Sequence, residues 1–122
     1  MTTISDYEKS IIALTCFTEF PGELWMTGLF GAMTLRNRAK AGWFEGSIYQ
    51  NAIAVLRERG RVIDFPDSRD PALTNLLTRL DSVYSDEVPD RTGGALYWIR
   101  SDAAELVSGE RTGQIGRYVF FR

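Results

Sequence analysis

The sequence contains no histidine. This absence excludes Ser-His-Asp and Cys-His nucleophilic catalysis, zinc sites with histidine ligands, and any imidazole that acts as an acid or base. Chemistry performed by this chain must therefore use carboxylates, lysine, tyrosine or hydroxyl groups. Asp64, Asp67 and Asp70 lie at three-residue spacing, but the glycine and the terminal glutamate of a calcium-binding EF-hand loop are missing. We predict no metal site and no cofactor.

Cysteine and long apolar runs are also scarce. Cys16 is the only cysteine, so no internal disulfide can form, as expected of a chain made in a reducing compartment. Its apolar neighbours favour a buried small hydrophobic residue over a reactive thiol. The apolar stretches are too short to cross a bilayer, so we expect no stable membrane insertion. The first ten residues lack the basic and apolar run of an export signal, which predicts synthesis in the cytoplasm without a signal peptide.

The chain has no basic excess, since its formal net charge is −2. Phosphate binding usually requires such an excess, so no nucleic-acid partner is expected. Two local basic clusters, at 36–40 and 57–61, are the exceptions. We interpret both clusters as solvated helix faces.

Length and periodicity predict one mainly α (α+β) domain that covers residues 1–122. Apolar residues spaced by three and four predict helices over 5–18, 23–40, 47–58 and 71–84. Ser5 is expected to cap the first helix with Glu8 as its capping-box partner, and Asp70 to cap the last. Two short aromatic runs, at 95–99 and 118–121, predict a small β element near the C-terminus, with a brief helix at 101–107.

One carboxylate lies at the end of the first predicted helix. Glu19 follows Thr15 by four residues and so lies on the apolar face, before Phe20-Pro21-Gly22 ends the helix. An apolar setting penalises the ionised form of an acid, as a proton donor near neutral pH requires. From position alone, the alternative is a helix-end carboxylate that pairs with Arg36, Arg38 or another base.

Five short fragments follow one another over about residues 7–122. They are Glu19-Phe20-Pro21-Gly22-Glu23, Leu35-Arg36-Asn37-Arg38, the stretch from Phe44 to Ile48, Pro89-Asp90-Arg91-Thr92-Gly93-Gly94-Ala95, and Ile115-Gly116-Arg117-Tyr118-Val119-Phe120. In this order they resemble the Glu-x-x-Gly-Glu element, the Asn-Arg pair, the Phe-Pro-Asn-Thr-Ile stretch, the Asp-Pro-Thr-Gly-Gly-Ala turn and the terminal Ile-Gly-x-His-x-Phe element of the SleB-like cell wall hydrolases.

The resemblance implies a lysozyme-like fold and cleavage of the MurNAc-GlcNAc bond of peptidoglycan, in the manner of a lytic transglycosylase, with Glu19 as the catalytic acid. One carboxyl can suffice, because the sugar's own C6 hydroxyl can attack the anomeric carbon and return a proton to the same group. The sequence departs from the family where Leu96-Tyr97-Trp98 replaces histidine and aromatics, and where Tyr118 replaces the terminal histidine. The family's Gln-Phe-Ser element is reduced to Asp64-Phe65-Pro66.

The resemblance also marks candidate substrate-binding residues, and each has a structural alternative. Glu23 is equally a residue of a helix N-terminus, favoured there by the helix dipole. Asn37 and Arg38 could position sugar or orient Glu19, or could equally serve only the end of their helix. Tyr97 and Trp98 alternate on a predicted strand, so one is expected to face the glycan and the other the core. The full set is Glu23, Asn37, Phe65, Gly94, Tyr97, Trp98 and Tyr118.

Three functions from different classes remain open at this point. The first is a peptidoglycan-cleaving enzyme that reaches the wall through a membrane pore, a virion or a secretion apparatus, with a phage lysis or tail-associated protein as the expected context and a phage or secretion-apparatus protein as a possible partner. The second is an inactive lysozyme-like module that binds glycan or a protein partner, suggested by the missing histidines. A weaker third alternative is a cytoplasmic regulator that uses the basic residues at 57–61.

Overall fold

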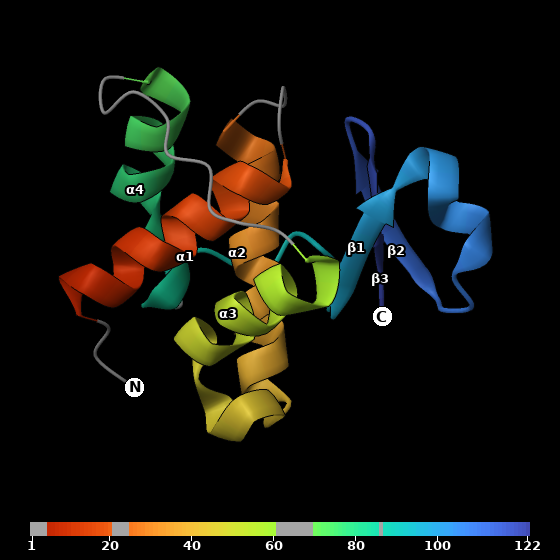
Figure 1. Ribbon diagram of the computed structural model, residues 1–122, viewed down its shortest axis with the longest axis horizontal. Helices are drawn as coiled ribbons and strands as arrows, with labels where there is room; N and C mark the ends of the chain where they lie inside the picture. Colours follow the sequence, from red (N-terminus) through yellow and green to blue (C-terminus); the bar gives the residue numbers. More distant parts are fainter. Residues whose placement is uncertain (1–4, 21–24, 61–69, 86) are drawn as a thin grey trace.

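The structure is a computed structural model that describes residues 5–20, 25–60, 70–85 and 87–122 (Figure 1). Within these ranges the helices precede a small sheet. In chain order the elements are α1 (Asp6–Glu19), α2 (Trp25–Lys40), the 3-10 helix η1 (Trp43–Gly46), α3 (Ile48–Arg59), α4 (Pro71–Tyr84), β1 (Tyr97–Arg100), the 3-10 helix η2 (Ser101–Leu106), β2 (Arg111–Ile115) and β3 (Tyr118–Phe121). This arrangement confirms the mainly helical fold class with a small C-terminal β element.

The first helix begins as the sequence predicts. Ser5 adopts extended backbone geometry, and its side chain accepts a hydrogen bond of 3.2 Å from the backbone N–H of Glu8. The Glu8 carboxylate accepts in return from the Ser5 backbone N–H, so the capping box is complete. The apolar face of α1 then carries Ile12 and Cys16 into the core, where both are fully buried. The prediction that Cys16 is a buried small hydrophobic residue is confirmed.

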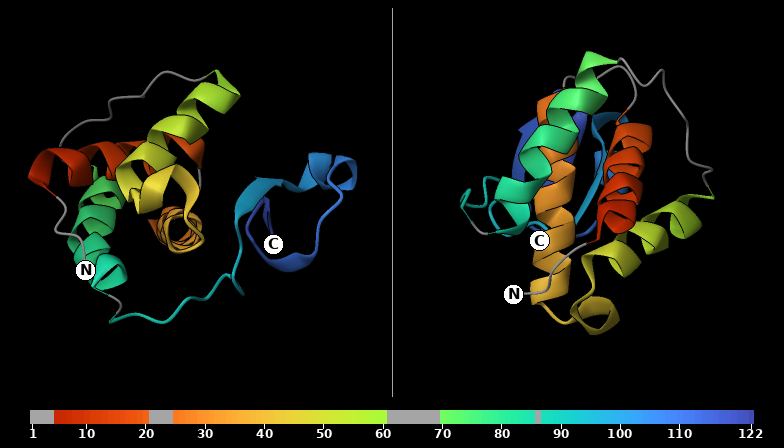
Figure 2. Two further views of the ribbon diagram at one scale, coloured as in Figure 1. Left: turned by 90° about the horizontal axis from the view of Figure 1, so that it is seen from below. Right: turned by 90° about the vertical axis from the view of Figure 1, so that its left-hand side faces the viewer.

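Helix α2 is the centre of the helical part. It packs against α1, α3 and α4, and both views in Figure 2 show it among them. Gly31 permits the closest approach, since a Cβ atom there would lie 2.5 Å from Cε2 of Phe20. The missing side chain at Gly31 therefore allows α2 to pack closely against the end of α1. The predicted start of this helix, at residue 23, lies outside the described residues.

The sheet is antiparallel with the strand order β1-β3-β2. Central strand β3 is buried along its whole length, and Trp98 of β1 pairs with Phe120. Strand β2 was not predicted. It reads Arg111 to Ile115 with no fully buried residue, and a register irregularity falls between Arg111 and Gly113. Its residues therefore lack the apolar alternation from which strands are recognised.

Aromatic rings connect the sheet to the helices, although the sheet stands to one side of them in Figure 2. Phe20, at the end of α1, has ring-centroid distances of 5.2 Å to Trp98 and 4.7 Å to Tyr118. Phe30 of α2 meets Phe120 edge-on at 5.9 Å. Such pairs bury large areas and favour tilted geometry. The end of α1 is thereby fixed directly behind β1, which decides where Glu19 lies.

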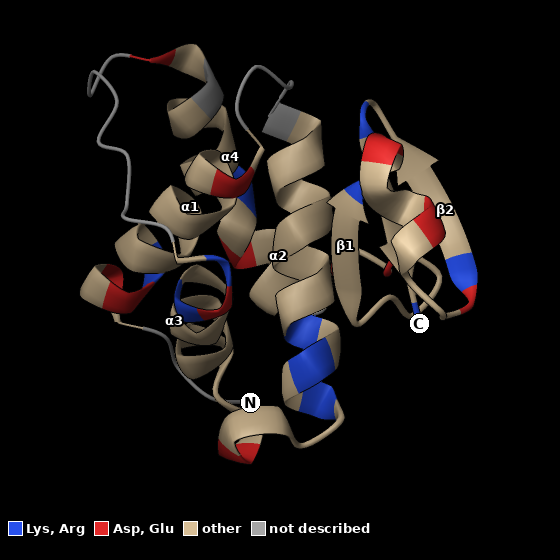
Figure 3. Ribbon diagram, turned by 45° about the vertical axis from the view of Figure 1, so that its right-hand side comes forward, with Lys and Arg blue, Asp and Glu red and all other residues tan. Residues whose placement is uncertain are grey.

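The interpretation of the basic cluster at 36–40 as a solvated helix face is wrong for two of its members. Arg36 and Arg38 are each only 4% exposed, in the basic last turns of α2 (Figure 3). Arg36 Nη1 donates to the backbone oxygens of Val83 and Val88, and Arg38 Nε donates to the oxygen of Leu96. Guanidinium groups can be buried where carbonyl oxygens accept hydrogen bonds from them. Both arginines thus tie α2 to the chain that leads to β1.

None of the helices in the described ranges combines the length and the hydropathy that a bilayer crossing requires.

Candidate active site

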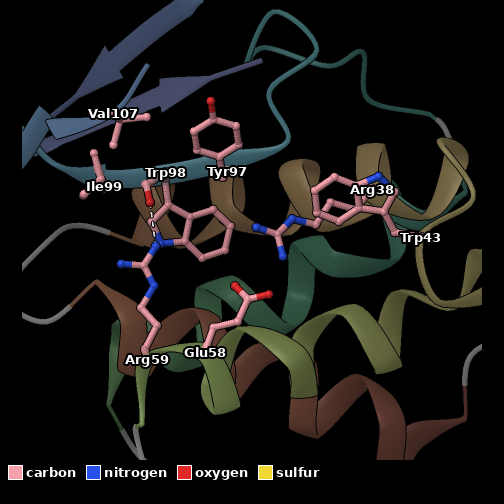
Figure 4. A pocket seen from close by; sticks show the side chains of 8 residues that line it. All are labelled: Arg38, Trp43, Glu58, Arg59, Tyr97, Trp98, Ile99 and Val107. Atoms are coloured by element: carbon pink, nitrogen blue, oxygen red, sulfur yellow. Dashed lines mark hydrogen bonds between the residues drawn. The ribbon is translucent and has the colours of Figure 1, made fainter. Parts of the chain in front are cut away.

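A cleft of about 640 Å³ lies between α3 and β1, with the end of α2 and η1 at one side. Figure 4 shows side chains from these elements turned toward the same space. Cations, a carboxylate and aromatic rings all contribute to its walls. The lining residues are Arg38, Trp43, Glu58, Arg59, Tyr97, Trp98, Ile99 and Val107. Aromatic rings beside a few convergent polar groups are typical of ligand-binding clefts.

Glu19 lies behind this cleft. Its side chain is 1% exposed, and Oε1 accepts a hydrogen bond of 3.1 Å from the indole Nε1 of Trp98. The same oxygen is 3.0 Å from Nε of Arg59. Both contacting residues line the cleft, so one layer of side chains separates the carboxyl from it. The surroundings of Glu19 are therefore not only apolar, because the described residues place the Trp98 indole N–H and the Arg59 guanidinium against it. The alternative in which Glu19 pairs with a base is also realised, with Arg59 as that base.

Arg59 is the last residue of α3 and covers Glu19 from the side of that helix. Its Nη2 donates to the backbone oxygen of Trp98 at 2.5 Å, drawn as a dashed line in Figure 4. Its guanidinium carbon is 5.9 Å from the centroid of the Trp98 indole. The side chain is 30% exposed. Arg57 and Arg59 are both exposed residues, as a solvated face predicts, but the Arg59 side chain also pairs with the buried Glu19.

Tyr97 and Trp98 both line the cleft, but they differ in burial and in the rings that they contact. Trp98 is 2% exposed and packs on Phe20 and Phe120, so its ring belongs to the core as well. Tyr97 is half-buried, and its ring stacks on Phe121 at 5.5 Å with an interplanar angle of 5°. The alternation of strand residues thus puts Trp98 against Glu19 and Tyr97 on the opposite face of β1.

The outer edge of the cleft is formed by Trp43, which is 38% exposed. The turn that carries it contains Phe44 at φ 52° and Glu45 at φ 58°, a left-handed conformation that is uncommon for residues other than glycine. Asn51 secures the turn, because its Nδ2 donates to the backbone oxygen of Trp43 at 3.0 Å. The stretch from Phe44 to Ile48 in the sequence resemblance therefore places an exposed indole beside the cleft.

Arg38 lies between two indoles. Its guanidinium carbon is 4.9 Å from the ring centroid of Trp43 and 6.0 Å from that of Trp98. Burial lowers the pKa of Arg38 below its ordinary value, while the charge of Glu58 raises it, that of Arg59 lowers it and that of Glu19 raises it. We call these four interacting residues, Arg38, Glu58, Arg59 and Glu19, the cleft cluster.

Asn37 and Gly94 meet in a different place. Asn37 Nδ2 donates to Oδ2 of Asp90, to Oγ1 of Thr92 and to the oxygen of Ala95. The backbone N–H of Gly94, at φ 83°, donates to the same Asp90 oxygen at 2.7 Å. We call Asn37, Asp90, Thr92 and Gly94 the turn cluster. None of them lines the cleft, and together they fasten α2 to the turn that precedes β1.

The remaining candidates are placed as follows. Tyr118 is 4% exposed and meets the ring of Phe20 edge-on, so it lies in the core and not among the cleft-lining residues. Glu23 and Phe65 lie outside the described residues. Sequence reasoning considered Arg38 beside Asn37 and as a base that could pair with Glu19, but it did not select Trp43, Glu58 or Arg59. The sequence points only weakly to Arg59, because the basic cluster reaches Glu19 only through the packing of α3 against α1.

Among the residues that the structure describes, no three acidic, cysteine or histidine side chains are grouped as a metal ion would require.

Comparison with known proteins gives one informative match. No family model matches the sequence, and no curated protein matches it. A solved structure does match: the catalytic domain of the germination-specific lytic transglycosylase SleB from Bacillus anthracis, with a TM-score of 0.71 and 18% sequence identity, covers 100% of this chain and 99% of that one. The chain therefore has the SleB fold over its full length, and the fold implied by the sequence resemblance is confirmed.

Proposed function

We propose that this chain cleaves the glycan strand of peptidoglycan at the MurNAc-GlcNAc bond as a lytic transglycosylase, with Glu19 as its acid. The observation that carries the proposal is the position of Glu19: a buried carboxyl at the end of α1, one side chain away from a cleft with aromatic walls. The fold shared with a lytic transglycosylase supports the same reaction. Of the predicted substrate-binding residues, Tyr97 and Trp98 are the two at the cleft.

The reaction needs only the carboxyl and the substrate. Glu19 gives its proton to the glycosidic oxygen as the bond from that oxygen to the anomeric carbon breaks. The C6 hydroxyl of the same muramic acid residue then attacks the anomeric carbon and passes its proton to the Glu19 carboxylate. A 1,6-anhydro ring forms, no water is consumed, and the acid is regenerated. The Trp98 indole, which donates to Oε1, holds the carboxyl in a fixed orientation.

Arg59 must move for this reaction to proceed. The Arg59 guanidinium lies 3.0 Å from the Glu19 carboxyl, and its side chain lies between Glu19 and the cleft. Because that side chain is partly exposed and ends in the cleft, a bound glycan can draw it away. We therefore propose that substrate entry separates Arg59 from Glu19 and uncovers the acid.

The second candidate is a module that binds glycan or a protein partner without cutting. The ion pair between Glu19 and Arg59 favours it, because a permanently paired carboxylate would have only a structural role. The phage-lysis context and the route to the cell wall stay predictions.

Digestion of purified peptidoglycan, followed by mass spectrometry, separates these functions. We expect the digestion products to be anhydro-muropeptides. Hydrated reducing ends would show hydrolysis and contradict the transglycosylase outcome. Retention of the chain on sacculi with no soluble product would support the binding module and contradict the enzyme.

A further inference from the structure

Arg38 has a hydrogen-bonding capacity that the fold does not use. The residue is 4% exposed, yet its Nη1 has no acceptor among the described residues. Its Nε is occupied by the oxygen of Leu96, which anchors the guanidinium plane. A buried charged donor without an acceptor destabilises a protein. Contacts within the fold therefore account for the Nε end of the Arg38 guanidinium but not for its other end, at Nη1.

That other end lies at the cleft. Arg38 is one of the lining residues, and its guanidinium points toward Trp98 in Figure 4. The Trp43 indole lies over the guanidinium at 4.9 Å and is 38% exposed. Rotation of this outer ring would uncover Nη1 without disturbing the anchor at Leu96.

We propose that Arg38 binds an acyl or carboxylate oxygen of the glycan and so selects N-acylated amino sugars over unsubstituted ones. This inference rests on the proposed function, because it assigns the substrate contact of the same cleft. A guanidinium donates to planar oxygen acceptors in fixed geometry, whereas sugar hydroxyls do not require it. The Trp43 ring, once turned outward, offers a face on which the sugar ring can pack.

Two groups of peptidoglycan carry such an oxygen: the N-acetyl carbonyl and the lactyl group of muramic acid, which is an amide carbonyl where it bears a stem peptide and a carboxylate where it does not. Three β-1,4-linked tetrasaccharides distinguish them. Cellotetraose has neither group, the chitin tetramer has acetyl groups only, and a muramic acid-containing tetramer has both. Each is titrated calorimetrically into the Glu19→Gln chain, so that bound glycan is not cut.

We expect Arg38→Met and Arg38→Lys, made in that background, to weaken binding of the acylated tetramers by about tenfold or more, as loss of a charge-assisted hydrogen bond implies. Binding of cellotetraose should be unchanged. A loss confined to the muramic acid tetramer assigns the contact to the lactyl carboxylate, and a loss for both acylated tetramers assigns it to the acetyl group. Arg57→Met, an exposed arginine of α3, is the matched control and should change nothing.

An equal loss for all three tetramers, or no loss for any, would overturn the inference, because a structural role does not depend on the ligand's substituents. If the Glu19→Gln chain itself binds no tetramer, the proposed function fails first, and the inference with it. Should the Arg38 variants not fold, the Nε–H nuclear magnetic resonance signal of Arg38 in the otherwise unsubstituted Glu19→Gln chain decides. It must shift with acylated tetramers and not with cellotetraose.

Discussion

The turn cluster and the cleft cluster both connect helices to β1, but they differ in the charge of the groups that they bring together. In the turn cluster one carboxylate, that of Asp90, accepts from four donors on Asn37, Thr92 and Gly94 at 2.6–3.1 Å. All of these donors are neutral. In the cleft cluster, Arg38, Glu58 and Arg59 line an open space, and the Glu19 carboxyl lies behind them. A closed neutral shell fixes geometry, whereas opposed charges beside a cleft can exchange partners with a ligand.

Arg59→Met should produce the largest loss of stability. It removes the Arg59 guanidinium from the buried Glu19 carboxyl, and removal of one partner costs 3–5 kcal/mol for fully buried pairs. Because the Arg59 side chain is 30% exposed, we expect about 2–3 kcal/mol in the free energy of unfolding by urea denaturation. The double variant Arg59→Met with Glu19→Gln should regain most of this loss, while exposed Arg57→Met should cost less than about 0.5 kcal/mol. A double variant no more stable than Arg59→Met would contradict the pairing.

Asp90→Ala should cost somewhat less stability and no intrinsic activity. Its donors lose their acceptor, which implies about 2 kcal/mol and a Tm lower by roughly 8 °C. Peptidoglycan cleavage per folded molecule, measured well below the Tm, should remain near the wild-type rate. Asp102→Ala, which removes an exposed partner of Arg100, is the control for a surface aspartate. A strong loss of activity with an unchanged Tm would assign the turn cluster to the site.

The acid response of the turn cluster is a smaller effect. Burial raises the pKa of Asp90, but hydrogen bonds from Thr92, Gly94 and Asn37 lower it by more, so its pKa in the folded chain lies below the ordinary 3.8. A depressed pKa contributes stability that is complete above the ordinary value and is lost as the pH falls through the folded-state pKa. The stability gap between the wild type and Asp90→Asn should therefore be constant above about pH 5 and narrow below about pH 4. A gap that widens on acidification would contradict the assignment.

Local sequence patterns were sufficient to predict helix positions and a helix cap. The helix at Pro71–Tyr84 begins and ends at the predicted residues, and the Ser5 capping box is present as expected. Strand β2 could not be predicted, because its five residues are largely exposed and contain Gly113. Its existence depends on pairing with β3, a neighbour that its own sequence does not specify.

The site was predicted only in part, for a related reason. The helix period predicted the buried position of Glu19, but its role as the acid and the selection of Trp98 came from the family resemblance. The roles of Arg38 and Arg59 depend on which elements meet in space, and charge alone suggested solvent. Asn37 and Gly94 were selected through the family resemblance. Such a resemblance does not distinguish residues that support the fold from residues that line the cleft.

The central claim, that Glu19 is the acid of glycan cleavage, is tested most directly by turbidity loss of a peptidoglycan suspension with Glu19→Gln. The substitution keeps the size of the side chain and an oxygen that can accept from Trp98. Glu105→Gln, an exposed residue of η2, is the matched control. We expect a cleavage rate at least about 100-fold below wild type for Glu19→Gln, a Tm within a few degrees, and an unchanged rate for the control. A Glu19→Gln chain that clears the suspension at near the wild-type rate would contradict it.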